Sequence, residues 1–139
     1  MDVEVDQYCF VCGLENPEGL KAAFQSADGK ATGRVSLRPE HQGYAGISHG
    51  GVVSALLDEA MVYAAVTLGR WATTAELTVR FSKPVPTGEA LVLAAEVTGH
   101  RSRLVECRAE LRDSAGALLA TATGKLMQSR ALRPGEERG

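Results

Sequence analysis

The sequence predicts an α+β fold in which one long central helix is wrapped by an antiparallel β-sheet. Residues 52–68 form one mostly apolar stretch within a helix expected over about 48–68, and the segments after it alternate apolar and polar residues. That alternation is typical of half-buried strands. Short turn signals separate these strands, so neighbours are expected to run antiparallel and to pack on the helix.

Length and composition place the chain among ordinary globular domains. Its 139 residues suit a single domain over 1–139, with an irregular N-terminal segment at 1–19 and a polar tail at 128–139. Hydrophobic residues make up 45% of the chain, which is enough for a core. A formal charge of −2 gives no basic field, which argues against nucleic acid as a partner. The acidic N-terminus lacks a signal-peptide pattern, so we expect a cytoplasmic protein.

Before the helix, the turn signal Asp28-Gly29 predicts a β-hairpin. The helix itself is expected to begin with Ser48 as its N-cap and to end near Leu68. Asp58 interrupts its apolar run together with the next residue, a second carboxylate. A membrane-spanning helix needs about 20 residues with few or no charges, so no membrane span is expected here.

The sheet is built from segments on both sides of the helix. After the helix, four strands are expected to follow one another as hairpins. The predicted strand segments are 20–25 and 31–37 before the helix, and 73–82, 90–98, 105–112 and 117–127 after it.

The helix is apolar nearly all round, and a single sheet can cover only one of its faces. A second copy of the chain is the simplest cover for the other face. We therefore expect at least a homodimer, and the sequence leaves dimer and tetramer open.

The start of the helix carries a group of residues that could form a catalytic or anion-binding site. His49-Gly50-Gly51 stands there, and Asp58 follows nine positions after the histidine. Glycines at a helix N-terminus expose backbone N–H groups to a ligand, and the helix dipole favours a phosphate or a developing oxyanion. A carboxylate in an apolar helix is costly unless it is paired or functional, so Asp58 is a candidate nucleophile or general base.

Three stretches of the chain resemble one family. GISHGGVVSALLDEAM, TAELTVRFSKPVPTGE and CFVCGLENPEGL together resemble the hotdog-fold acyl-CoA thioesterases of the phenylacetate-pathway (PaaI-like) type, over roughly residues 9–128. The resemblance implies a hotdog fold whose sheets join across a dimer. It also implies hydrolysis of an acyl-CoA, or a related acyl thioester, to the free acid and CoA. No cofactor is implied.

The resemblance also implies roles for single residues. The Gly50 N–H would polarise the thioester carbonyl, with Gly51 beside it in contact with substrate, and Asp58 would be the nucleophile or general base. His49 would shape the loop and the site. Thr74 would position water or the acid, and we expect its hydroxyl to face the site because simple alternation places it on the side of its strand opposite Ala75 and Leu77.

Two further groups are candidates for substrate contacts. Several members of the family have an Asn six residues before the motif histidine, where this chain has Gly43, and Gln42 could supply a polar contact instead. Arg101 and Arg103 could hold the phosphates of a CoA nucleotide. A solvated charged turn is an equally good interpretation of these two arginines.

Each candidate has a structural alternative. Gly50 and Gly51 could serve only close packing, and His49 could simply hydrogen-bond the loop. Asp58 could be a buried acid paired across a dimer seam. Glu59 is the rival acid, about 100° further round the helix, and it is interpreted as a structural or dimer contact.

Cys9-Phe-Val-Cys12 has the spacing of metal ligands but is a single such pair. Zinc would need two more ligands, sought among Cys107 and the three histidines, and a redox pair is also possible. The favoured interpretation is two cysteines in a packed N-terminal loop, with no metal.

Two other functions compete with thioester hydrolysis. One is a hotdog dehydratase or hydratase acting on acyl thioesters, which typically pairs a catalytic His with an acid in motifs that this chain lacks. The other is a non-catalytic acyl-CoA-binding protein of the same fold.

Overall fold

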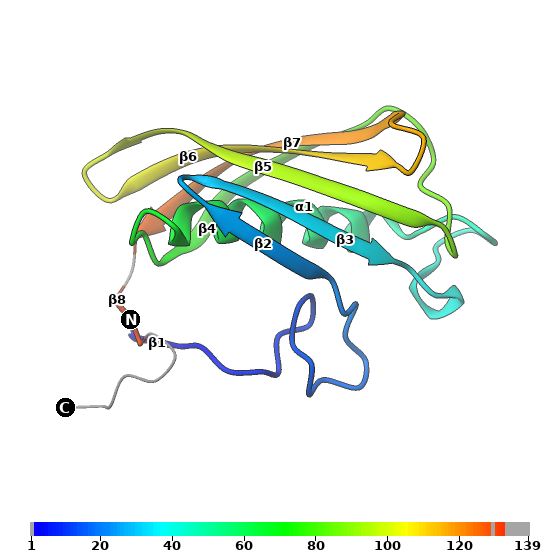
Figure 1. Ribbon diagram of the computed structural model, residues 1–139, viewed down its shortest axis with the longest axis horizontal. Coiled ribbons are helices and arrows are strands. Elements are labelled where there is room, and N and C mark those ends of the chain that lie inside the picture. Colours follow the sequence, from blue (N-terminus) through cyan, green and yellow to red (C-terminus); the bar gives the residue numbers. More distant parts are fainter. Residues whose placement is uncertain (1, 129, 133–139) are drawn as a thin grey trace.

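The computed structural model describes residues 2–128 and 130–132, and it confirms the predicted α+β architecture. One helix lies against one face of a six-stranded sheet (Figure 1). The elements are β1 (Asp2–Glu4), β2 (Ala23–Ala27), β3 (Lys30–Ser36), the 3-10 helix η1 (Pro39–His41), α1 (Gly50–Val66), β4 (Ala72–Phe81), β5 (Ala90–Arg101), β6 (Leu104–Asp113), β7 (Leu118–Gln128) and β8 (Arg130–Leu132).

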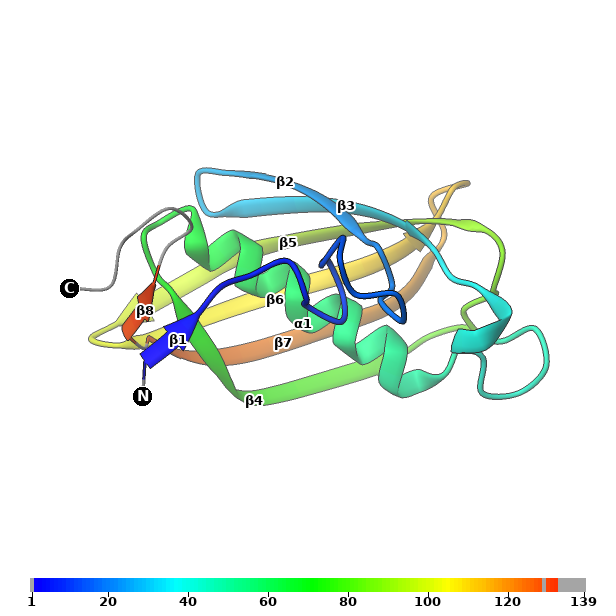
Figure 2. The ribbon, with the colours of Figure 1, turned by 90° about the horizontal axis from the view of Figure 1, so that it is seen from below.

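The sheet has the strand order β2-β3-β5-β6-β7-β4, and all its neighbours are antiparallel (Figure 2). The prediction that consecutive hairpins join the four strands after the helix is wrong at one point, because β4 pairs with β7 at one edge of the sheet while β5 pairs with β3. The connection between β4 and β5 is therefore a crossover. Its backbone bonds to the loop before α1, since Ser48 N donates to Val85 O at 2.7 Å and Thr87 N donates to Gly46 O at 3.1 Å.

The core lies between α1 and the sheet. The helix turns an almost continuous row of buried side chains toward the strands, and β5, β6 and β7 supply the matching apolar surface. Fully buried members include Leu56, Leu57, Ala60, Met61 and Ala64 of the helix, and Leu93, Val105, Leu111 and Leu126 of the strands. No helix among the described residues is long and apolar enough to cross a bilayer.

The helix begins one residue later than predicted. Its N-cap is His49, whose Nδ1 accepts a hydrogen bond from Gly51 N at 2.9 Å. Ser48 was expected in this role, but its backbone is engaged with Val85 and its side chain is buried. His49, the next residue, therefore caps the helix.

Strand β4 carries a bulge that changes which side chains face the helix. Thr74 pairs with Leu126 and Glu76 pairs with Lys125, so Ala75 is an extra residue between them. An extra residue reverses the alternation of side chains on one side of the bulge. Thr74 consequently lies on the same sheet face as Leu77, toward α1, and the simple alternation expected from the sequence is wrong here.

The N-terminal segment lies across the face of α1 that is turned away from the sheet (Figures 1 and 2). Val11 and Leu20 are buried in the core, and Phe24 of β2 stacks on Tyr63 of the helix with ring centroids 4.5 Å apart. From the sequence, a second copy of the chain is expected to cover this whole face. The chain itself covers part of it, and the homodimer stays a prediction.

The two ends of the described chain lie together. β1 (Asp2–Glu4) pairs in parallel with β8 (Arg130–Leu132) and forms a two-stranded sheet. No strand was expected there, because the sequence indicated an irregular N-terminal segment and a polar tail. Such short strands have little alternation to detect in the sequence, and their pairing depends on the fold that brings the ends together.

Candidate active site

The N-terminus of α1 presents one exposed backbone donor. The Gly50 N–H makes no hydrogen bond to any residue in the described part of the chain, whereas the Gly51 N–H is taken by His49 Nδ1. Gly51 was expected to contact substrate, but its donor is already used as a helix cap. A Cβ at Gly51 would lie 3.1 Å from His49 Nδ1, whereas one at Gly50 would meet only Phe81, at 3.4 Å.

The two nearby histidines support the loop. Because His49 Nδ1 accepts a hydrogen bond, the proton of its neutral ring is assigned to Nε2. Its backbone N donates to His41 O at 2.9 Å, and His41 Nδ1 accepts from Arg38 N at 3.0 Å. Burial, followed by the charge of Arg38, holds the pKa of His41 below its ordinary value. His49 therefore caps the helix, the role that the sequence assigned to Ser48, and its backbone holds the loop. Its part in shaping the site stays a prediction.

Asp58 and Thr74 meet between the helix and the edge strand. Thr74 Oγ1 donates a hydrogen bond to Asp58 Oδ1 at 2.5 Å, across 16 residues of sequence. Asp58 is half-buried and Thr74 exposed. The bulge at Ala75 makes this contact possible, since it turns the hydroxyl toward α1. A hydrogen bond to the carboxylate compensates part of the cost of placing Asp58 in an apolar helix.

The two acids of the helix point to different surroundings. Glu59 Oε2 accepts a hydrogen bond from Cys9 Sγ at 3.0 Å, on the side covered by the N-terminal segment. Asp58 faces β4 instead. The structure thus separates the two carboxylates and gives Glu59 a contact within its own chain.

Gly50 and Asp58 do not converge within one chain. Both belong to α1, eight residues apart, so the rise of 1.5 Å per residue separates them by about 12 Å along the axis. A reacting group has to lie within about 3–3.5 Å of its target atom. In the reaction predicted from the sequence, Gly50 and Asp58 of one chain would therefore belong to two separate half-sites.

Gln42 lies in the loop before the helix start. Its Oε1 accepts from Gly46 N at 3.1 Å, and its backbone forms a bridge with Ser48. The Gln42 side chain is thereby engaged in closing the loop. Position 43, where family members often carry Asn, faces the helix start, because a Cβ there would lie 3.4 Å from His49 Cα.

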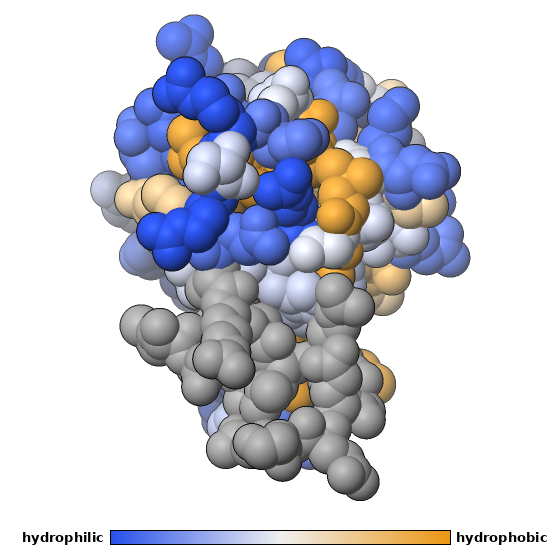
Figure 3. Space-filling model, turned by 90° about the vertical axis from the view of Figure 1, so that its left-hand side faces the viewer, coloured by the Kyte–Doolittle hydropathy of each residue, from blue (hydrophilic) through white to orange (hydrophobic). Residues whose placement is uncertain are grey.

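Arg101, the last residue of β5, and Arg103, in the turn to β6, lie at the opposite end of the molecule from the N-terminus of α1 (Figure 1). Arg70, just beyond the end of α1, donates to Ser102 O in this turn at 3.0 Å. The surface at this end is mostly hydrophilic (Figure 3). Both arginines are exposed. The structure does not bring them to the Gly50 half-site of the same chain.

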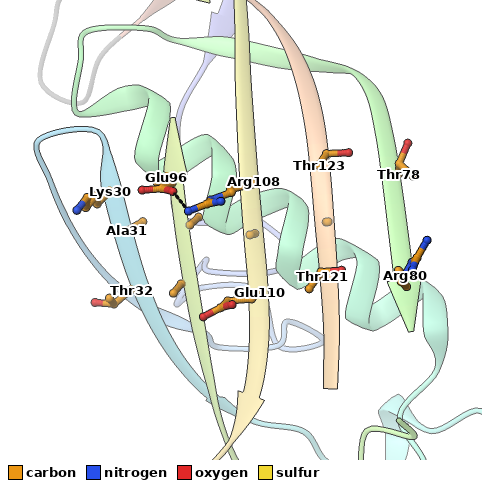
Figure 4. A pocket seen from close by; sticks show the side chains of 14 residues that line it. Lys30, Ala31, Thr32, Thr78, Arg80, Glu96, Arg108, Glu110, Thr121 and Thr123 are labelled. Carbon is orange, nitrogen blue, oxygen red and sulfur yellow. Dashed lines mark ion pairs between the residues drawn. The ribbon is translucent and has the colours of Figure 1, made fainter. Parts of the chain in front are cut away.

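A broad hollow of about 620 Å³ lies on the other side of the sheet (Figure 4). Small and polar side chains line it, including Thr32, Thr78 and Thr121, and an ion pair joins Glu96 to Arg108. The helix lies behind the strands in this view, and none of the candidate catalytic residues lines the hollow. The chemistry suggested by Asp58 therefore belongs to the helix side of the sheet.

Comparisons with known proteins bear on this geometry. A family model described as the thioesterase superfamily matches residues 45–120, from the loop before α1 into β7. A curated protein of Archaeoglobus fulgidus named "Putative esterase" is 29% identical over 97 residues, which are 70% of this chain and 63% of that protein.

Solved structures show the same fold. One described as a thioesterase superfamily protein has a TM-score of 0.83 at 28% identity, over 88% of this chain and 61% of that one. The PaaI protein of the E. coli phenylacetic acid degradation operon has a TM-score of 0.74 at 23% identity, over 78% and 84%. These likenesses confirm the hotdog fold. The chain spans less than two thirds of the A. fulgidus protein and of the first of these structures.

Proposed function

The chain belongs to the thioesterase superfamily, and from that premise we propose that it hydrolyses an acyl-CoA to the free acid and CoA. One observation carries the proposal. The helix that begins with the exposed, unbonded N–H of Gly50 also holds Asp58, whose carboxylate is oriented by the hydroxyl of Thr74 at 2.5 Å. A positioned carboxylate and a donor for an oxyanion are the two groups that acyl transfer needs.

The Gly50 N–H supplies the electrophilic side of the reaction. It lies at the positive end of the α1 dipole, so it stabilises the negative charge that develops on the thioester oxygen. The absence of a Cβ lets a carbonyl approach this backbone group closely.

Asp58 supplies the attacking side, and two routes are open to it. As a general base, it takes a proton from water while the water oxygen bonds to the carbonyl carbon. The C–S bond then breaks, and the proton passes to the CoA sulfur. As a nucleophile, its oxygen bonds to the carbonyl carbon, the C–S bond breaks and CoA leaves as the thiolate, which takes a proton from solvent. Water then hydrolyses the resulting acyl-enzyme anhydride, which releases the acid and restores the Asp58 carboxylate. Thr74 holds Oδ1 in both routes, which leaves Oδ2 for the reaction.

The axial distance of about 12 Å between Gly50 and Asp58 supports a site shared by two subunits. Two antiparallel copies of α1 across a two-fold axis would bring the N-terminus of one beside the middle of the other. The Gly50 half-site of one subunit would then face the Asp58–Thr74 half-site of its partner.

Two structural neighbours support the substrate class. A Streptococcus mutans protein is described as bound to acetyl-CoA, and a hypothetical thioesterase of Streptococcus pneumoniae as holding coenzyme A, each at 16% identity. The S. pneumoniae protein was also solved as two alanine variants, of an aspartate and of a threonine 16 residues later. Asp58 and Thr74 have the same separation, 16 residues.

The competing dehydratase or hydratase activity receives less support. Such enzymes pair a histidine with an acid, whereas here the partner of Asp58 is a threonine and His49 Nδ1 is engaged as a helix cap. A non-catalytic acyl-CoA-binding protein would keep the fold and would release no CoA.

The proposal is tested by following free CoA with a thiol reagent over a panel of acyl-CoA substrates. Asp58→Asn keeps the size of the side chain and removes its charge, so turnover should fall by orders of magnitude in a folded protein. Glu76→Gln on strand β4 is a matched control, because its only ion pair among the described residues is a 3.8 Å contact with Lys125. Full activity in folded Asp58→Asn would overturn the assignment. Binding without CoA release in the wild type would indicate the non-catalytic alternative.

A further inference from the structure

Two cysteines and a glutamate meet on the outer face of α1. Cys9 and Cys12 come from the N-terminal segment, and Glu59 comes from the helix. The two sulfur atoms and a carboxylate oxygen all lie within 4.8 Å of one another, and each residue is half-buried. The sequence indicated the cysteine pair, with further metal ligands expected among Cys107 and the three histidines. Glu59 was not recognised as a partner of the two cysteines.

The loop that carries the cysteines is shaped to hold both sulfurs on one side. Val11 N donates to Cys9 Sγ at 3.4 Å, and Gly13 N donates to Cys9 O at 2.9 Å. A Cβ at Gly13 would lie 2.4 Å from Cys9 N, so this tight turn requires glycine. Lys21 Nζ holds the following residues by donating to three backbone carbonyls. The backbone therefore fixes the turn that carries the two cysteines, and it bonds directly to the sulfur of Cys9.

The charge at this cluster is unbalanced without a cation. Glu59 forms no ion pair with a Lys or Arg in the described part of the chain.

We propose that Cys9, Cys12 and Glu59 bind a zinc ion that fastens the N-terminal segment to α1. Thiolate ligands select a soft or borderline cation over Mg²⁺ or Ca²⁺, and a carboxylate is a known third ligand of zinc. Tetrahedral zinc with bonds of about 2.3 Å to sulfur holds two sulfurs about 3.8 Å apart, and the donor atoms here all lie within 4.8 Å of one another. Cys9 Sγ and the Glu59 oxygen, which are 3.0 Å apart in their hydrogen bond, have to separate by about 0.5 Å when the metal replaces the thiol proton.

Binding proceeds with a simple balance of protons and charge. The two thiols lose their protons to solvent, and the metal forms two bonds to sulfur and one to a carboxylate oxygen. Water completes the tetrahedron. Because Glu59 and Asp58 face different sides of α1, this ion would lie apart from the proposed reaction site and would act on the folding of the N-terminal segment.

The test uses the full chain, reduced, stripped with a chelator and titrated with Co²⁺ and then Zn²⁺. The wild type should bind about one metal ion per chain and show the absorption bands of tetrahedral, thiolate-bound cobalt. Cys12→Ser and Glu59→Gln should lose stoichiometric binding. Cys107→Ala should retain it, because Cys107 is buried between α1 and the sheet, where its sulfur lies 3.8 Å from Met61 O.

A second measurement does not depend on the spectra. Hydrogen exchange of the amides at 9–13 should slow on adding zinc to the wild type and to Cys107→Ala, and should not change in Cys12→Ser. Circular dichroism confirms that each variant is folded. Absence of zinc binding by the reduced wild type would overturn the proposal, as would equal binding by Cys12→Ser. A metal-free Cys9–Cys12 disulfide in the purified protein would assign the pair to redox chemistry instead.

Discussion

The proposed active site, shared between two subunits, makes a quantitative prediction. Gly50 and Asp58 are separated by about 12 Å along one helix, and an aspartate side chain extends far less than that. The perturbation is a pair of variants that damage different half-sites. Asp58→Asn removes the attacking carboxylate, and Gly50→Leu blocks the approach to the backbone N–H. A Cβ at Gly50 meets only Phe81, at 3.4 Å, so this substitution should be compatible with folding.

The expected recovery follows from random pairing of the two variants. Each variant alone should be nearly inactive. In a mixture of equal amounts that has exchanged subunits, half of the dimers are mixed, and each mixed dimer has one intact site of two. The mixture should therefore recover about one quarter of the wild-type activity per chain.

The assay is CoA release, measured before and after subunit exchange, with differently tagged chains to count the mixed dimers. An equal mixture of Asp58→Asn and wild-type chains should keep half of the wild-type activity before and after exchange, so it controls for any activity lost in the exchange step itself. If mixed dimers form and the activity stays at the level of the separate variants, both groups act within one chain and the distance argument fails. A protein that stays monomeric while active would refute it equally.

Two further predictions concern single side chains. Thr74→Val removes the hydrogen bond to Asp58 and should lower kcat by about tenfold, because a hydrogen bond to a charged group contributes about 1.5 kcal/mol or more. Thr74→Ser should retain most activity, as should Thr78→Val on the same strand, and an unchanged kcat in Thr74→Val would leave the hydroxyl without a catalytic role. Since the pKa of buried His41 is lowered on folding, the unfolded chain takes up its proton first as the pH falls. The free energy of unfolding should then decrease below about pH 6.5, and denaturant titrations of His41→Gln should show a weaker dependence on pH.

The local elements were predictable because their signals lie within a few residues of one another. The apolar run that forms α1 and the alternation in β6 and β7 are properties of short windows, and the structure confirms them. The Asp58–Thr74 contact was expected through the family resemblance. The geometric reason given for it was wrong, because the sequence does not reveal the extra residue at Ala75.

What the sequence could not indicate depends on contacts between distant segments. The place of β4 beside β7 is set by a pairing across the chain, and the crossover that follows β4 looks like an ordinary turn. The cover that the N-terminal segment gives α1, and the meeting of Cys9 with Glu59, also join residues far apart in sequence. Even the helix cap depends on such a contact, since Ser48 is held by Val85 of the crossover.

Because of the bulge in β4, the orientation of the Thr74 hydroxyl depends on the number of residues in the strand as well as on the residue type at position 74. Deletion of Ala75 would let the strand pair regularly with β7 and would change none of the candidate catalytic residues. The side chain at position 74 would nevertheless turn to the opposite face of the sheet, away from Asp58. The bulge thus interrupts the regular hydrogen-bond ladder between β4 and β7, and it orients the Thr74 hydroxyl toward Asp58. A related chain that lacks the extra residue needs a one-residue gap before position 76 when its strand is compared with this one, because counting positions without the gap would match residues that face opposite sides.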